Sequence, residues 1–231
     1  MNDLTTTGMI LSVMPIGEYD RRVEILSAEL GRISAFARSA RKPGSPLVSA
    51  TRVFAFGEFT LYQGKNSYTV HSAKIRNYFD SLTADMDHMY YGFYFLELAQ
   101  YFSRENLEAG DMLKLLYCAL KALGHPSFND LLVKRIVELK MLEINGLCPS
   151  MDRLLAGEGS FSFARDLSGA CVKALQRVIG MPPQKVFSFA LSEEVLQEFS
   201  CVVKELMRIS VDREFKSEKL LDTMSDLTYN T

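Results

Sequence analysis

The sequence lacks the short motifs by which many enzymes are recognised. It contains no GxxxxGK loop for phosphates, no GxGxxG turn, and neither an HExxH nor a GxSxG segment. Its three histidines, His71, His88 and His125, are dispersed, and none is close in sequence to a cysteine or to paired carboxylates. We expect each to be a surface or hydrogen-bonded imidazole. Only a site that the fold assembles from distant residues would make this chain an enzyme, so the sequence predicts a non-enzymatic protein.

Cysteines and long apolar runs are also scarce. The four cysteines, Cys118, Cys148, Cys171 and Cys201, form no CxxC pair. There is no signal peptide and no apolar run long enough to cross a bilayer, which together predict a reduced, cytoplasmic protein. Cys118 and Cys201 lie in helical patterns and are expected to be small buried hydrophobic residues.

A strong basic excess, which is typical of nucleic-acid-binding proteins, is missing from the chain as a whole. The formal net charge is −2 and the pI is about 6.0. This average conceals an asymmetry, because residues 1–76 contain ten Lys or Arg against six Asp or Glu, whereas the remainder contains sixteen against twenty-two. The first third of the chain is therefore basic and the rest is acidic.

Residues 9–75 show the pattern of short β-strands separated by turns. A connection at residues 63–66 contains Gly64 and is typical of a hairpin. Five strands in about seventy residues is the size of a small Greek-key barrel such as the OB-fold. The predicted strands are residues 9–15, 22–27, 31–39, 53–62 and 67–72.

The third predicted strand alternates most clearly, with a charged face that carries one aromatic residue. Ile33, Ala35 and Ala37 fall on one face. The opposite face carries Arg32, Ser34, Phe36 and Arg38. This strand is followed by a loop, residues 38–46, that contains three cations and too much Pro and Gly for regular structure.

Basic residues interleaved with aromatic residues on a barrel of this size predict single-stranded nucleic-acid binding. Such barrels hold the phosphates with Lys and Arg and stack the bases on aromatic faces. Tyr19, Phe36 and Tyr68 are the candidate platforms, while Phe54, Phe56 and Phe59 are expected in the core. For any one cation, simple solvation of the barrel remains the alternative, but for the cluster of Arg38, Arg41 and Lys42 we favour contact. The candidate DNA-binding cations are Arg21, Arg22, Arg32, Arg38, Arg41, Lys42, Arg52, Lys65 and Lys74.

After residue 75 the apolar pattern changes to that of helices. The residues from 84 to 102, capped by Thr83, are apolar on several sides and are expected to form the central helix of a second domain. An irregular Gly-rich stretch is expected up to residue 169. We predict an α+β protein, with an OB-fold domain at residues 1–79 and a mainly α-helical domain at residues 80–231. Its further helices are predicted at residues 111–123, 128–144, 170–179 and 192–209.

Several of these segments, in this order and spacing, resemble the RecO family over nearly the whole chain. Residues 17–22 (GEYDRR), 26–33 (LSAELGRI) and 37–45 (ARSARKPGS) resemble its opening strands and basic loop. The later pieces are residues 56–59 (FGEF), 62–65 (YQGK), 95–98 (FLEL) and 213–217 (REFKS). The resemblance implies an OB-fold followed by a helical domain and the binding of single- and double-stranded DNA. It also implies annealing of strands coated by single-stranded-DNA-binding protein and loading of the RecA recombinase together with RecR, in the RecF pathway of recombinational DNA repair. The resemblance further implies that the protein is located in the bacterial cytoplasm and associates with the nucleoid during repair.

The segment at about residues 146–175 departs from the family pattern. Many relatives carry two close cysteine pairs after a Gly-x-x-Pro element, a spacing suited to tetrahedral zinc. Here the element is present at residues 146–149, but the first pair is replaced by Leu154 and Gly157. Of the second pair only Cys171 remains, with Ala174 at the companion position. We therefore expect no metal and no other cofactor, with apolar packing of Leu154 in place of the cross-link.

The resemblance also implies that the helical domain receives the acidic, apolar tail of single-stranded-DNA-binding protein. By position, Lys134 and Arg135 would be the cations that face this tail, although they could equally be ordinary surface charges. A different class of function remains open as well. The barrel could be a scaffold that binds a polypeptide partner instead of DNA.

Overall fold

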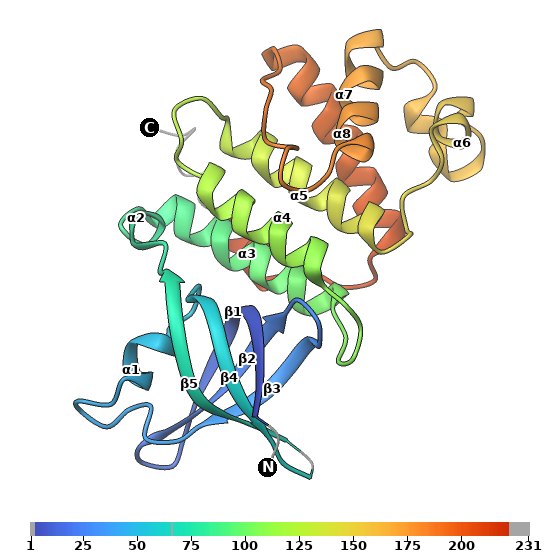
Figure 1. Cartoon of the computed structure of the whole chain (residues 1–231). Helices are drawn as coiled ribbons and strands as arrows, with labels where there is room; N and C mark the ends of the chain where they lie inside the picture. Colours follow the sequence, from blue (N-terminus) through green and yellow to red (C-terminus); the bar gives the residue numbers. More distant parts are fainter. Residues whose placement is uncertain (1–2, 66, 222–231) are drawn as a thin grey trace. The chain divides into compact units, whose positions relative to one another are not determined.

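The computed structural model describes residues 3–65 and 67–221 and divides them between two compact units (Figure 1). The first unit consists of Met1–Ala84 and Ala99–Leu113, and the second of Asp85–Leu98 and Lys114–Thr231.

The first unit contains a closed five-stranded barrel, which confirms the predicted fold class. The strands are β1 (Asp3–Ile16), β2 (Asp20–Ser27), β3 (Gly31–Ala37), β4 (Phe56–Gln63) and β5 (Tyr68–Asn77). They close in the order β1-β2-β3-β5-β4, with β3 and β5 parallel and every other pair antiparallel. The predicted connection between β4 and β5 is a tight turn in which the Gly64 amide donates to the Ser67 carbonyl at 2.9 Å; Asn66 lies outside the described residues.

The alternation predicted for the third strand is confirmed. Ile33, Ala35 and Ala37 are fully buried in the barrel core, whereas Phe36 on the other face is 37% exposed. Phe54 and Phe59 are buried as expected, and Phe56 is partly buried.

The barrel differs from the prediction where the backbone is irregular. The strand predicted from residue 53 begins instead at Phe56, because Phe54 adopts a positive φ of 70° that no strand tolerates. A short helix, α1 (Leu47–Ala50), follows the basic loop and was not predicted. β1 and β5 are longer than expected.

A segment distant in sequence, Ala99–Leu113, completes the first unit. The Asn106 amide donates to the Leu30 carbonyl at 2.8 Å, and the Arg32 amide donates to the Arg104 carbonyl at 3.1 Å. Gly31 makes this approach possible, because its φ is +67° and an added Cβ would lie 2.0 Å from the Arg104 carbonyl oxygen. Part of the outer surface of β2 and β3 is thereby covered, while Arg22 and Phe36 on this surface stay exposed.

The remaining elements are helical. The predicted cap Thr83 instead ends the short helix α2, and Asn129 caps α5 by accepting from two backbone amides. Residues 146–169, expected to be irregular, contain α6 and a 3₁₀ helix, η1. In the described chain no helix is long and apolar enough to span a membrane. The helices are α2 (Asp80–Thr83), α3 (Met86–Phe102), α4 (Gly110–Ala122), α5 (Asp130–Ile144), α6 (Met151–Ala156), η1 (Gly159–Ala164), α7 (Gly169–Gly180) and α8 (Glu193–Ser210).

The central helix of the second unit is α5, and not the segment at residues 84–102 that was predicted for this place. Every residue of α5 from Leu132 to Leu142 is buried. α8 buries only one stripe of apolar residues, and Cys201 falls outside that stripe. The prediction that Cys201 is buried was therefore wrong, while Cys118 is partly buried.

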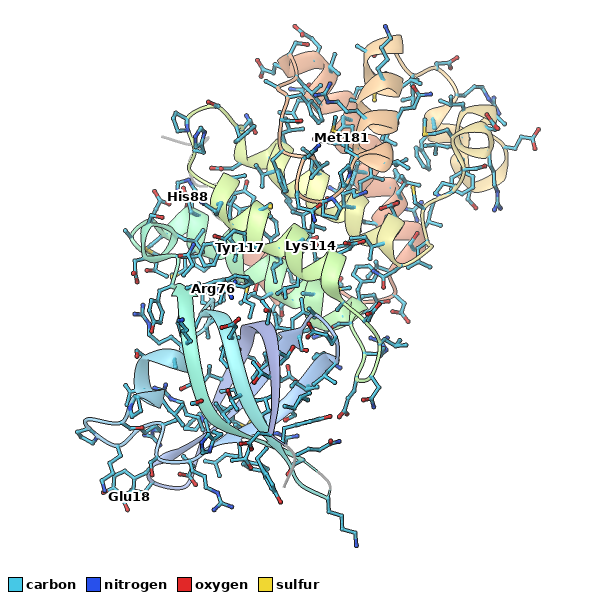
Figure 2. The ribbon with its side chains drawn as sticks, in the orientation of Figure 1. Glu18, Arg76, His88, Lys114, Tyr117 and Met181 are labelled. Carbon is cyan, nitrogen blue, oxygen red and sulfur yellow. The ribbon has the colours of Figure 1, made fainter. Side chains whose placement is uncertain are left out.

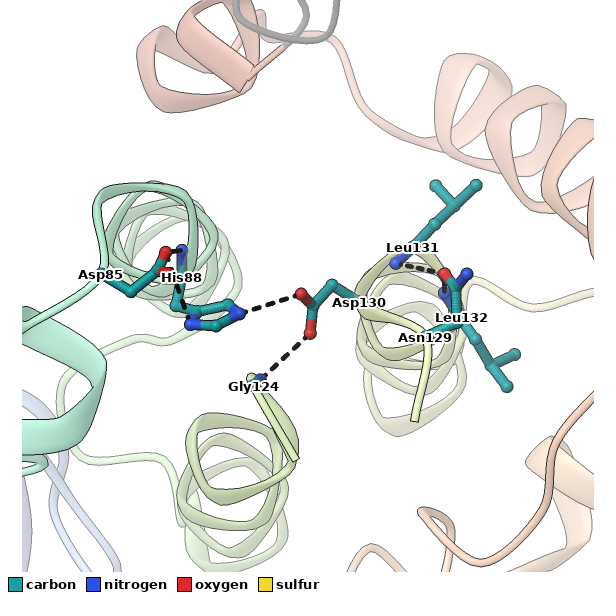
Figure 3. Close-up of polar contacts among 7 residues, drawn as sticks. All are labelled: Asp85, His88, Gly124, Asn129, Asp130, Leu131 and Leu132. Atoms are coloured by element: carbon teal, nitrogen blue, oxygen red, sulfur yellow. Dashed lines mark hydrogen bonds and ion pairs between the residues drawn. The ribbon is translucent and has the colours of Figure 1, made fainter. Parts of the chain in front are cut away.

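A histidine joins three helices of the second unit (Figure 3). The His88 Nε2 lies 3.1 Å from Asp130 Oδ2, and its Nδ1 lies 3.4 Å from Asp85 Oδ1. The other Asp130 oxygen accepts from the Gly124 amide at 3.1 Å. Gly124 has φ +69°, and a Cβ added to it would lie 2.7 Å from the His88 ring. The junction thus requires glycine for both its backbone angle and its lack of a side chain.

This geometry predicts that Gly124→Ala lowers the free energy of unfolding by about 1–3 kcal/mol, as measured by chemical denaturation. Gly146→Ala is the matched control, because Gly146 also follows a helix at φ +70° but nothing lies within 4 Å of its added Cβ. The control shares the backbone strain without the collision. Equal losses for the two variants would show that the contact with His88 is unimportant.

Candidate nucleic-acid interface

The open outer surface of β2 and β3 contains a hollow of about 570 Å³. Arg22 on β2 lies directly opposite Phe36 on β3, and the Arg22 Nε donates to Ser34 Oγ at 2.8 Å. In OB-folds, strands 2 and 3 together with the loops after strands 1 and 4 are the surfaces that bind oligonucleotides. The hollow occupies the corresponding place in this barrel. It is lined by Arg22, Ser34, Phe36, Gln63, Gly64, Lys65, Ser67, Tyr68, Glu105 and Asn106.

The predicted aromatic platforms divide between surface and core. Phe36 is 37% exposed and Tyr19 is 45% exposed, so both rings are open to a ligand. Tyr68 is only 6% exposed and belongs to the core of the barrel. Tyr68 therefore cannot offer an open face to a base, and its prediction as a platform was wrong.

The basic loop at residues 38–46 is fastened to the turn between β1 and β2. The Arg41 amide donates to the Tyr19 carbonyl at 2.8 Å, and the Ser39 amide donates to Asp20 Oδ1 at 2.7 Å. Arg38, Arg41 and Lys42 are all exposed. This loop, the β1–β2 turn and the β4–β5 turn lie at one end of the barrel, which Glu18 marks in Figure 2.

Arg21 has a structural role that the sequence did not reveal. Its Nη1 donates to the Val48 carbonyl and to Thr51 Oγ1, each at 2.8 Å, and so holds α1 against β2. Burial lowers the pKa of Arg21, and the nearby positive charge of Arg41 lowers it further. The guanidinium of Arg21 is therefore already engaged within the protein.

Three other predicted cations lie apart from this end of the barrel. Arg32 is partly buried beside the segment that covers β3. Arg52 forms an ion pair with Asp80 at 3.4 Å. Lys74 is exposed on β5 in register with Glu58, which in turn pairs with Arg76 at 2.7 Å near the opposite end of the barrel (Figure 2).

The structure thus places five of the nine candidate cations and two aromatic rings toward one end of the barrel. Of the nine candidate DNA-binding cations, only Arg52 forms an ion pair with a carboxylate among the residues that the structure describes. Glu105 is the acidic residue among those that line the hollow. The cations at this end therefore keep their charge available for an external anion. They are Arg22, Arg38, Arg41, Lys42 and Lys65.

Lys134 and Arg135 in the second unit are buried, which excludes the alternative that they are ordinary surface charges. Lys134 is 4% exposed and Arg135 is 9% exposed. Arg135 donates to Glu138 Oε2 at 2.7 Å, and Lys134 donates to Glu218 at 2.8 Å. Their ionic partners lie within the protein, because Glu138 is completely buried between them.

A second hollow, of about 580 Å³, opens beside Arg135. Exposed cations of α8 and of the segment after it line it together with Arg135: Lys204, Arg208, Arg213 and Lys219. Glu205, Asp212, Glu214 and Glu218 contribute negative charge to the same lining. The lining residues include no Ser, Cys or His. Its lining residues are spread over α5, α8 and the segment after α8, so no local sequence pattern marks this surface.

The positions at which the resemblance implies cysteine pairs are buried, and only Cys171 among them carries a thiol. Leu154 and Cys171 are fully buried, and Ala174 is 5% exposed. Burial raises the pKa of Cys171 to about 12, with the charge of Glu198 adding to the effect, so its thiol stays protonated at neutral pH. Leucine, glycine and alanine supply no ligand atom, so these residues do not fit tetrahedral zinc. In the part of the chain that the structure describes, no three His, Cys, Asp or Glu side chains gather as a metal site.

Comparison with known proteins agrees with this arrangement. Residues 1–79 match the family model "Recombination protein O N terminal", and residues 83–219 match "Recombination protein O C terminal". The chain is 27% identical to the DNA repair protein RecO of Acetivibrio thermocellus over 97% of its own length and 98% of the relative. It is 26% identical to the protein of the same name from Dehalococcoides mccartyi, over 97% of each chain. Since the two models together match nearly all of it, the chain belongs to the Recombination protein O family.

Proposed function

We propose that this protein binds single-stranded DNA at the end of its barrel and anneals complementary strands during recombinational DNA repair. Membership of the family supports a role in DNA repair and recombination. The observation that carries the finer proposal is the hollow that Phe36 lines together with Arg22 and Lys65, at the end of the barrel where the basic loop with its exposed cations also lies. Charge and aromatic surface together are what an unpaired strand requires.

Annealing follows from binding without any bond-making step. Cations that cover the phosphates reduce the repulsion between two strands and raise their local concentration. The loop cations Arg38, Arg41 and Lys42 contact backbone charge, which duplex DNA also carries, so we propose that both forms bind. The proposed activity needs neither a catalytic residue nor a metal or other cofactor.

The proposed protein partners are RecR, with which the protein helps to load the RecA recombinase, and single-stranded-DNA-binding protein. For the acidic tail of the latter we propose the second hollow, where Lys204 and Arg213 are exposed beside Arg135 and Arg208 is already paired with Glu205 at 2.9 Å. In this proposal Arg135 contributes one edge of the site. Lys134 contributes indirectly, because its ammonium group is already paired with Glu218.

The test of the proposal is the salt dependence of binding to single-stranded DNA, measured by fluorescence anisotropy with a labelled oligonucleotide. A site with about four phosphate contacts gives a slope near −3 in a plot of log affinity against log salt, or roughly 50-fold weaker binding between 50 and 200 mM salt. Negligible binding, together with tight binding to a polypeptide partner, would instead identify the barrel as a protein-interaction scaffold.

A further inference from the structure

A row of three outward-facing side chains crosses the barrel wall beside the hollow. Met14 on β1 is in register with Arg22 on β2, and Arg22 is in register with Phe36 on β3. Neighbouring strands are about 4.8 Å apart, so the outer two members are separated by roughly 10 Å. The row therefore places a cation between two apolar side chains on one surface.

The outer members of this row are unusually open for apolar side chains. Met14 is 61% exposed and Phe36 is 37% exposed, whereas Ala35 and Ala37 beside Phe36 are fully buried and Val13 beside Met14 is partly buried. The next strand along the wall has the small Thr69 in register with Phe36, and Thr69 is only partly buried. The side chain in register with Phe36 on β5 is therefore too small to cover the Phe36 ring.

The cation in the middle of the row is oriented by its neighbour. The Arg22 Nε donates to Ser34 Oγ at 2.8 Å, which fixes one edge of the guanidinium and leaves its terminal nitrogens for other acceptors. A planar guanidinium and an aromatic ring both stack on bases, and a thioether packs against aromatic surfaces. Lys65, across the hollow, supplies a charge for the accompanying phosphate.

We propose that Met14, Arg22 and Phe36 form a base-binding site that makes the barrel surface selective for unpaired strands. This inference rests on the proposed function. The faces of bases are available in a single strand and are covered by stacking in a duplex, so the row distinguishes the two forms, whereas the loop cations contact phosphates in both. The proposed ligand of this site is a single-stranded polynucleotide with intact bases.

The chain contains no tryptophan, which allows a direct test. Phe36→Trp retains an aromatic face and introduces the sole indole, so the fluorescence of this variant should be quenched by oligothymidylate. A duplex or an abasic oligonucleotide of equal length should leave it nearly unchanged. The control is Met86→Trp, since Met86 is 58% exposed on α3 in the second unit. Quenching of both variants to the same extent, or quenching of the Phe36→Trp variant by the abasic strand as well, would overturn the proposal.

A binding measurement completes the test. The double change of Met14→Ser and Phe36→Ala should weaken oligothymidylate binding at least tenfold, because each stacked base contributes about 1–3 kcal/mol. Duplex and abasic-strand affinities should change less than twofold. Equal losses for all three ligands, or no loss for any, would overturn the base-binding row while leaving DNA binding itself established by the wild-type protein. Absence of DNA binding by the wild-type protein would instead be a failure of the proposed function.

Discussion

Reversing the charges of Arg41 and Lys42 together, by Arg41→Glu and Lys42→Glu, is expected to weaken single-stranded DNA binding roughly 60-fold or more at 50 mM salt. The estimate follows from two lost phosphate contacts, each of which contributes about 0.7 to the salt slope. The same loss should shrink to about tenfold at 200 mM salt, and the slope itself should fall by about 1.4. Oligonucleotides of different sequence should be affected alike, because these side chains are assigned to phosphates and not to bases.

The control for this variant must change the net charge of the protein by the same amount but leave every residue of the barrel unaltered. Lys173→Glu and Lys185→Glu together meet this need, since both side chains are exposed in the second unit. The substitution removes one side-chain hydrogen bond of the loop, from Arg41 Nη1 to the Gly17 carbonyl at 3.3 Å, but the backbone bond from the Arg41 amide to the Tyr19 carbonyl remains, so we expect the loop to keep its place. An equal loss of affinity in the two double variants would mean that overall charge, and not the basic loop, governs binding.

The parts of the fold that could be predicted are those whose signal lies within one element. Alternation with period two identified the buried row of Ile33, Ala35 and Ala37, because side chains of a strand point to opposite faces in turn. The basic loop was recognisable in the same way, since Pro43 and Gly44 interrupt regular structure among the cations. Local rules therefore predicted the barrel wall and its most basic loop.

The parts that could not be predicted depend on partners distant in the chain. Nothing near Arg21 in sequence shows that it will donate to Val48 and Thr51. Composition likewise cannot show that Arg52 will pair with Asp80. The sequence could therefore predict which cations are present in the barrel, but not which of them remain free to bind.

The same limit applies to the burial of two cations of the second unit. Lys134 and Arg135 are adjacent charges in a helical pattern, and such pairs usually face solvent. Their burial depends on Glu138 one turn later and on Glu218, which is far along the chain. A distant carboxylate that neutralises a buried ammonium leaves no periodic signal in the sequence.

That buried cluster leads to the prediction with the largest effect on stability. Glu138 accepts from the Tyr94 hydroxyl at 2.7 Å and from Arg135 at 2.7 Å, and it lies 3.8 Å from the Lys134 ammonium. Burial, reinforced by the charge of Glu138, raises the pKa of Tyr94 well above its usual value, so the phenol remains a neutral donor. Glu138→Gln removes the central negative charge and leaves Arg135 as a buried cation without its carboxylate. We expect a loss of about 3–5 kcal/mol in the free energy of unfolding, measured by denaturant titration with far-ultraviolet circular dichroism.

The matched control is Glu143→Gln on the same helix. Glu143 also pairs with a buried lysine, because Lys140 donates to it at 2.7 Å, but the same ammonium donates to the Met181 carbonyl at 2.9 Å and so keeps an acceptor. The Glu143 side chain is also 33% exposed, which weakens the ion pair through solvent screening. The control should therefore lose no more than about 1 kcal/mol. Similar small losses in both variants would show that Arg135 and Lys134 find other partners or water when Glu138 is neutral, and that the cluster does not depend on this carboxylate.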